Sequence, residues 1–147
     1  MNWKNVYLET RILSASPLEL INILYEHAIL EVEEARRHLA ARDIAARARS
    51  ITKTIAIIGE LQRSLDPSRG GEIAANLGRL YQYMLVRLTE GNVRQADEPL
   101  VEVGRLLESL SEAWRAISGG TESWEDTPAM HIPVGEASTS SMSGWSV

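Results

Sequence analysis

The feature that most constrains the fold of this chain is an apolar stripe with a 3-4-3-4-3-4 spacing along its first long helical segment. This spacing places apolar residues on one side of a helix, where they contact neighbouring helices. The members of the stripe are Leu18, Ile21, Tyr25, Ala28, Val32, Ala35 and Leu39. Three similar stripes follow, and no segment alternates with the period of two that is typical of a strand. The sequence therefore predicts an all-α protein, an antiparallel up-down four-helix bundle.

The ends of the predicted helices carry residues that commonly begin and end helices. Ser16 is expected to be the N-cap of the first helix, with Pro17 at its first position. Asp43 is expected to cap the second helix, and Gly91-Asn92 to end the third at a left-handed residue. Helices of this length, joined by short connections, pack antiparallel to their neighbours. The four predicted helices cover about residues 16–41, 43–65, 73–91 and 97–118.

The first helix is also apolar on the side opposite its stripe. Successive side chains of a helix are rotated by about 100°. The side chains that point roughly 160–180° away from the stripe are Leu20, Ile23, His27 and Leu30. A helix that is buried on one side only should have a polar back, and this one becomes polar only from Glu34 onward. We therefore expect the first three turns to be covered by the chain's own terminus, a second subunit or a partner segment.

The two ends of the chain differ from its body. Residues 1–15 are apolar without helical spacing, so we expect an extended N-terminal segment. Residues 119–147 are rich in Ser, Gly and Thr and are expected to form a mostly disordered acidic tail. The predicted organisation is thus an N-terminal segment at 1–15, a helical bundle at 16–118 and a flexible tail at 119–147.

Composition and charge exclude several kinds of site and partner. The chain has no Cys, which excludes disulfides, thiol nucleophiles and Cys-based zinc sites. The formal charge is −5, of which residues 119–147 contribute −4 through four acidic residues without any Lys or Arg. The remaining 15 basic and 16 acidic residues leave the body near neutral. A near-neutral body argues against a nucleic-acid partner.

The sequence also bears on location. No apolar run reaches the roughly 18 residues of a membrane-spanning helix, and the first residues lack the apolar centre of a signal peptide. We therefore expect neither a secretory signal nor membrane insertion. Basic residues between Arg36 and Lys53 are interpreted as solvated helix ends, with an acidic partner or a membrane surface as the alternative.

No catalytic or metal-binding constellation is recognisable. A di-iron bundle needs Glu three residues before His on facing helices, and none of His27, His38 or His131 has one. The apolar stripes carry no acidic residue, and no Gly-rich phosphate loop is present. The sequence therefore predicts a binding module with no metal and no cofactor, not an enzyme. A histidine phosphotransfer protein acting through His27 is one alternative.

Four segments, in their order and spacing, resemble the sequences of one known family. They are Tyr7 and Thr10 followed by ASPLELI at 15–21, LYEHA at 24–28, LQRSLD at 61–66 with GGEIA at 70–74, and the EV, LL and AW pairs between 102 and 114. Together they resemble the FliS family, the flagellar secretion chaperones dedicated to flagellin, over about residues 7–117.

The resemblance implies an antiparallel helical bundle and a cytosolic chaperone. Its partner would be the C-terminal region of flagellin, which stays unfolded until assembly. The chaperone would prevent premature polymerisation and deliver flagellin to the export gate protein of the flagellar type III apparatus, with a possible co-chaperone. The family's N-terminal segment can lie over apolar grooves, and a Tyr there is linked to docking at the export gate. Only Tyr7 matches that position here.

The resemblance and the apolar back of the first helix together predict the site. The expected flagellin-binding residues are Leu20, Ile23, Leu24, His27, Leu30, Tyr83 and Val86. The residues expected to form a lid or to dock at the export gate are Tyr7, Leu8 and Ile12. A second alternative is a self-associating structural module, with the back of the first helix as its dimer seam.

Overall fold

The computed structural model describes residues 3–118 and contains five helices and no strand in that range. The helices are α1 (Trp3–Ser14), α2 (Pro17–Ala40), α3 (Ile44–Arg63), α4 (Pro67–Arg94) and α5 (Asp97–Ser118). The predicted all-α class is therefore confirmed. The predicted tail, residues 119–147, lies outside the described residues.

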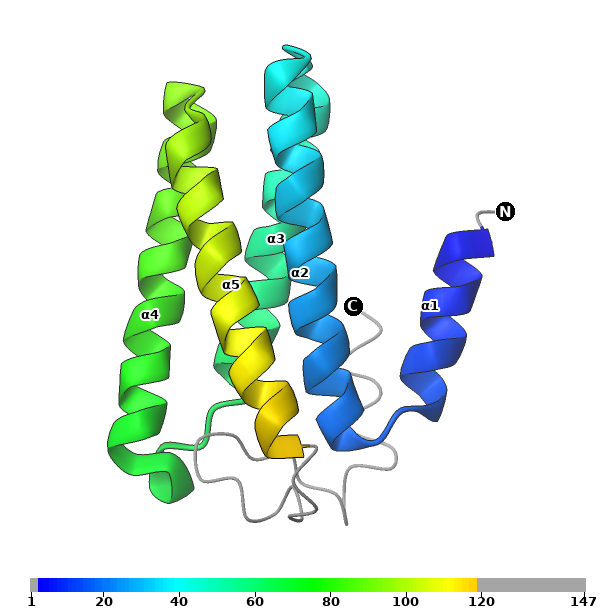
Figure 1. Cartoon of the computed structure of the whole chain (residues 1–147), viewed down its shortest axis with the longest axis vertical. Coiled ribbons are helices and arrows are strands. Elements are labelled where there is room, and N and C mark those ends of the chain that lie inside the picture. Colours follow the sequence, from blue (N-terminus) through cyan, green and yellow to red (C-terminus); the bar gives the residue numbers. More distant parts are fainter. Residues whose placement is uncertain (1–2, 119–147) are drawn as a thin grey trace.

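Helices α2 to α5 lie side by side around one hydrophobic core (Figure 1). Helix α2 packs against α3 and α5, and α4 packs against the same two helices, so α2 and α4 occupy diagonal corners. This arrangement is consistent with an antiparallel bundle. All four helices contribute to the fully buried core, and its largest members are Ile21, Tyr25, Val32, Ile51, Ile58, Leu61, Tyr81, Met84, Leu88, Leu100, Val103 and Leu107.

Two predicted N-caps are confirmed. The backbone of Ser16 is extended, and its hydroxyl accepts a hydrogen bond from the amide of Glu19 at 3.3 Å. The carboxylate of Asp43 accepts from the amide of Ala46 at 3.1 Å. Each oxygen satisfies one of the amides that have no partner within the first turn of a helix.

The predicted end of the third long helix at Gly91 is wrong, because α4 continues to Arg94. Its C-cap is Gln95, which adopts the left-handed conformation with φ 54°. Gly91 instead allows α4 and α5 to approach each other. A Cβ atom at this position would lie 2.9 Å from Cδ2 of Leu100. Close packing against α5 therefore explains the glycine at this position. In the sequence alone, a glycine near the end of a helix looks the same whether it serves packing or a C-cap.

Helix α4 also begins earlier than predicted, at Pro67. The carboxylate of Asp66 caps it by accepting from the amides of Ser68 and Arg69 at 3.0 and 3.3 Å. The predicted gap between residues 65 and 73 is instead occupied by the start of α4, which is kinked at Gly71, where φ is 53° and ψ is −126°. Such a conformation is accessible to glycine and strained for other residues.

The N-terminal segment is not extended as predicted but forms helix α1. Leu8 and Ile12 are four residues apart and half-buried, with Arg11 between them, so one side of the helix faces the protein. Val6 and Leu13 are exposed on other sides and obscure this period in the sequence. Pro17 then disfavours helical geometry at Ser16, which separates α1 from α2.

The interpretation of the basic residues as solvated helix ends is wrong for Arg47. This side chain is buried and joins α3 to α4. Its Nε donates to Oδ1 of Asn92 at 3.0 Å, and its Nη2 donates to the carbonyl oxygen of Asn92 at 3.2 Å. By contrast, Arg36 lies at the surface and pairs with Asp97 at 2.8 Å. Part of the apparent basic cluster is thus used within the fold.

A hydrogen bond between Tyr25 of α2 and Tyr81 of α4 crosses the core. The two hydroxyl oxygens lie 2.5 Å apart, and both side chains are almost completely buried. Burial raises the pKa of Tyr25 to about 12 and raises the pKa of Tyr81 further, so both hydroxyls are protonated at physiological pH. Each hydroxyl satisfies the other in a region where an unpaired polar group would be costly.

Replacing Tyr25 with Phe should leave the hydroxyl of Tyr81 buried without this partner. We expect the free energy of unfolding to fall by about 1–3 kcal/mol, measured by urea denaturation. The double replacement Tyr25→Phe with Tyr81→Phe removes both polar groups and should recover most of this loss. A double variant as unstable as the sum of the two single variants would show that the bond does not stabilise the protein.

Candidate binding faces

The predicted residues of α2 divide into a covered part and an open part. Leu20 and Ile23 are only 5% and 4% exposed, although they lie outside the main core cluster. Leu24 is half-buried and packs against that core. Leu30 is 63% exposed, so the face opens toward the C-terminal half of α2. We refer to Leu20, Ile23, His27 and Leu30 as the α2 face.

Helix α1 lies beside the α2 face. Figure 1 shows α1 running next to α2 and diverging from it toward the N-terminus. Arg11 of α1 forms an ion pair with Glu26 of α2 at 3.0 Å. Leu8 and Ile12, which were predicted as part of a lid, are half-buried in α1, and Tyr7 belongs to the same helix. The structure thus places all three predicted N-terminal residues in an element next to the predicted site.

His27 is the one titratable residue of the α2 face. Its imidazole is half-buried, and this burial lowers its pKa below the ordinary value of 6.5. Glu31 and Glu26 oppose this shift, whereas Lys53 of α3 contributes to it. His27 is therefore neutral at physiological pH and serves this face as a half-apolar contact.

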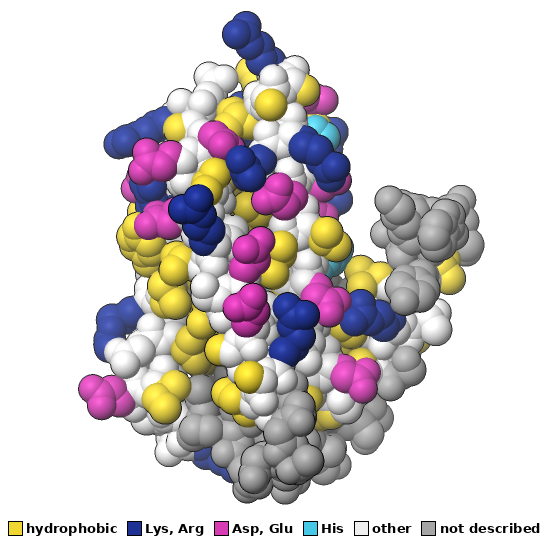
Figure 2. All heavy atoms as spheres, viewed as in Figure 1, with side chains coloured by type: hydrophobic (Ala, Val, Ile, Leu, Met, Phe, Trp, Pro, Cys, Tyr) yellow, Lys and Arg dark blue, Asp and Glu magenta, His cyan; other side chains and the backbone are white. Residues whose placement is uncertain are grey.

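A second apolar face lies on the outer side of α4. Tyr83 is 44% exposed and Val86 is 49% exposed. Val93 lies seven residues after Val86, on the same side, and is also exposed. Sequence reasoning missed Val93, although its spacing from Val86 would have indicated it. Figure 2 shows hydrophobic side chains gathered at the surface on the side where α4 lies. We refer to Tyr83, Val86 and Val93 as the α4 face.

The structure does not bring the predicted flagellin-binding residues together into one patch. Helices α2 and α4 occupy diagonal corners, and each presents its face away from the shared core. Leu30 and Val86 therefore lie on opposite sides of the helical body. A ligand that contacts both faces must be long and must pass around α3 or α5.

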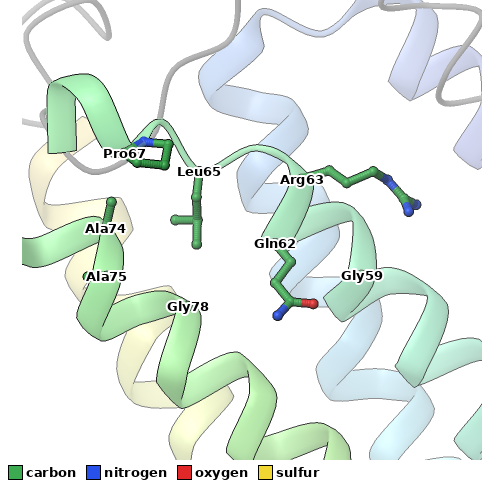
Figure 3. Close-up of a pocket in the computed structure, with 8 residues that line it drawn as sticks. All are labelled: Gly59, Gln62, Arg63, Leu65, Pro67, Ala74, Ala75 and Gly78. Carbon is green, nitrogen blue, oxygen red and sulfur yellow. The ribbon is translucent and has the colours of Figure 1, made fainter. Parts of the chain in front are cut away.

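A pocket of about 560 Å³ lies between the end of α3 and the start of α4 (Figure 3). Figure 3 shows Leu65 between the two helices, whereas Arg63 is directed away from the pocket. Small residues form much of its wall, and none of the predicted binding residues lines it. The residues that line it are Gly59, Gln62, Arg63, Leu65, Pro67, Ala74, Ala75 and Gly78.

Two further kinds of site were sought in the described part of the chain. Residues 3–118 contain no group of three His, Cys, Asp or Glu side chains that could hold a metal ion. Within the same range, no helix has the length and apolar character that crossing a membrane requires.

Comparison with known proteins identifies the family. The chain matches the family described as Flagellar protein FliS over residues 1–121. The chain belongs to the FliS family. It is 39% identical to the flagellar secretion chaperone FliS of Salmonella typhimurium over 117 residues, which cover 79% of this chain and 87% of that protein.

Two further relatives agree with this assignment. The flagellar secretion chaperone FliSB of Pseudomonas aeruginosa is 37% identical over 79% of this chain and 92% of its own length. The flagellar secretion chaperone FliS of Campylobacter jejuni is 32% identical over 77% of this chain and 88% of its own length. The predicted FliS resemblance is therefore confirmed, and all three of these relatives carry the name flagellar secretion chaperone.

The stability of this FliS-family chain should fall as the pH falls below about 6.5. The pKa of His27 is lowered in the folded state, so the unfolded chain binds the proton first and acidification favours unfolding. Replacing His27 with Gln should reduce this pH dependence, measured as the free energy of unfolding at pH 7.5 and pH 5. The matched control is His38→Gln, near the end of α2, where the imidazole lies 3.6 Å from the carboxylate of Glu34. If His27→Gln retained the full pH dependence, the burial of His27 would not be its cause.

Proposed function

We propose that this chain is a cytoplasmic export chaperone that binds the C-terminal region of flagellin. It would prevent premature polymerisation and deliver flagellin to the export gate of the flagellar type III apparatus. The observation that carries this proposal is that a chain of the FliS family exposes Leu30 on the outer side of α2, and Tyr83, Val86 and Val93 on the outer side of α4. In this proposal α2 to α5 form an antiparallel up-down four-helix bundle that presents those faces.

The separation of the two faces suits an amphipathic ligand. The terminal helices of flagellin bury their apolar sides only in the filament, so a chaperone must offer a substitute surface, as in helix-in-groove recognition. Fully burying one large aliphatic side chain contributes about 1.5–3 kcal/mol before costs. Ordering an unfolded segment costs several kcal/mol. Contacts spread over the α2 and α4 faces would therefore give an affinity that still permits release.

Helix α1 would act as a displaceable cover of the α2 face. The side chains of its ion pair, Arg11 and Glu26, are 40% and 41% exposed. Such surface pairs contribute roughly 0–1 kcal/mol to stability. Displacement of α1 would open the covered half of the face around Leu20 and Ile23. Tyr7, carried by the displaced segment, would then be available to the export gate, as the family resemblance implies.

Replacing Leu30 with Asp should weaken binding of flagellin by roughly 10- to 100-fold, because the variant loses the burial of a large apolar side chain. The same change at Val86 should have a similar effect on the opposite face. Both side chains are exposed in the free protein, so the melting temperature should hardly change. Calorimetric titration with flagellin measures the affinity.

The matched control for these variants is Ile44→Asp. Ile44 is 58% exposed, close to the value for Leu30, but lies on neither proposed face. It should bind flagellin as the wild type does. A flagellin that lacks its C-terminal region should bind none of these proteins, and equal binding of that truncated flagellin would refute the proposal.

Deleting residues 2–12 should tighten flagellin binding or leave it unchanged. A cover that is closed for part of the time lowers the apparent affinity by the fraction of molecules that are open. The milder variant Arg11→Ala keeps α1 but removes the ion pair with Glu26, and it should shift the affinity in the same direction by a smaller factor. A large loss of affinity on deletion would show instead that α1 forms part of the binding surface.

A further inference from the structure

Tyr83 differs from the other members of the α4 face because its hydroxyl is fixed by a hydrogen bond. Its hydroxyl donates to the carboxylate of Glu102 on α5, 2.9 Å from each of the two oxygens. The ring is too exposed for packing alone to fix it. An exposed aromatic side chain without such an anchor distributes among several rotamers.

Glu102 is itself held in place by Arg87 of α4. The Nε atom of Arg87 donates to Oε1 of Glu102 at 2.6 Å, and its Nη1 donates to Glu90 at 2.8 Å. A third carboxylate, that of Glu98, lies 3.6 Å from Nη2. The hydrogen bond from Arg87 is the main cause of a lowered pKa for Glu102, which therefore stays ionised at neutral pH. Tyr83 is thus anchored to a network that spans α4 and α5.

We infer that Glu102, held by Arg87, is a positioning residue that fixes the ring of Tyr83 beside Val86 on the α4 face. The incoming apolar side of an amphipathic segment then meets an aromatic side chain that is already ordered. This inference rests on the proposed function, because the bound segment is the one proposed above. The inference assigns a role in binding to Glu102 and Arg87, which would act through Tyr83 without contacting the ligand.

The expected effect follows from the cost of ordering a side chain on binding. If the ring of Tyr83 is mobile in the free protein, binding must order it, and affinity is lost by about two- to tenfold. If the ring is already fixed, this loss is avoided. The effect of removing the anchor should therefore be smaller than that of removing the ring.

A double-mutant cycle tests the inference on the full-length protein, with calorimetric titration of flagellin. Tyr83→Phe removes the hydroxyl and keeps the ring, and Glu102→Ala removes the acceptor. Each should weaken binding by about two- to tenfold, and the double variant should be no weaker than the weaker single variant. Glu102→Gln keeps an acceptor oxygen and should retain most of the affinity.

Two controls separate this role from general effects. Glu108→Ala removes an exposed carboxylate from the same helix but outside the network, and should bind as the wild type does. Tyr83→Ala removes the ring and should bind more weakly than Tyr83→Phe. The melting temperatures of all variants should stay close to that of the wild type, because the network lies at the surface.

A spectroscopic titration shows whether the anchor exists in solution. The hydrogen bond to Glu102 raises the pKa of Tyr83, so the phenol should ionise at lower pH in Glu102→Ala. The difference in absorbance between each protein and its Tyr83→Phe counterpart isolates this residue from the other tyrosines. An unchanged titration in Glu102→Ala would overturn the inference.

The binding data distinguish the failure of the inference from that of the proposed function. If Tyr83→Ala weakens binding but Tyr83→Phe and Glu102→Ala do not, the ring contacts flagellin without being positioned, and only the inference fails. If the wild type does not bind flagellin, the proposed function fails and the inference fails with it.

Discussion

The hydroxyls of Tyr25 and Tyr81 meet within the core, and their bond links the two helices at diagonal corners of the protein. Because each is a buried hydroxyl that the other satisfies, sliding or rotating either helix would break the pair and leave two polar groups unpaired. The bond therefore fixes which sides of α2 and α4 point inward. At about 100° per residue, a side chain five positions later lies about 140° around the helix. Leu30 follows Tyr25 by five positions, and Val86 follows Tyr81 by five positions, so both side chains point away from the core.

The orientations of the two apolar faces are thus consequences of the same core contact. Ile23 lies two residues before Tyr25 and Tyr83 lies two residues after Tyr81, which again places them roughly opposite the core. The resulting faces look outward from diagonal corners, with α3 and α5 between them. Under the proposed function, this geometry favours a segment that wraps around the helical body over one that lies in a single groove.

Much of the fold could be predicted because it depends on local patterns. The apolar stripes identify the core of α2 to α5, and Ser16 and Asp43 identify two helix starts. The errors occur where a residue type has two physical uses. Gly91 has the signature of a C-cap but serves close packing against Leu100. Arg47 belongs to a run of basic residues that reads as solvated but is buried against Asn92.

The candidate site could be predicted only in part, because helical periodicity tells which residues point away from the core but not what covers them. It placed Leu20, Ile23 and Leu30 on one side of α2, yet the first two are buried and the third is exposed. The anchor of Tyr83 was missed for a related reason. Glu102 lies on the next helix, and no spacing within one helix can show a contact between two.

Under the proposed function, this chain must expose apolar surface without binding to copies of itself. The charges around the α4 face would help to prevent such self-association. Large exposed apolar patches promote association, whereas interspersed charges limit it. Here Arg87, Glu90 and Glu102 border Tyr83 and Val86, so an approaching apolar surface that offers no polar partner would have to desolvate them. On the α2 face, α1 lies beside the apolar residues through a weak surface ion pair. Under the proposed function, the two faces would therefore limit self-association in different ways, one through a charged border and the other through a neighbouring helix.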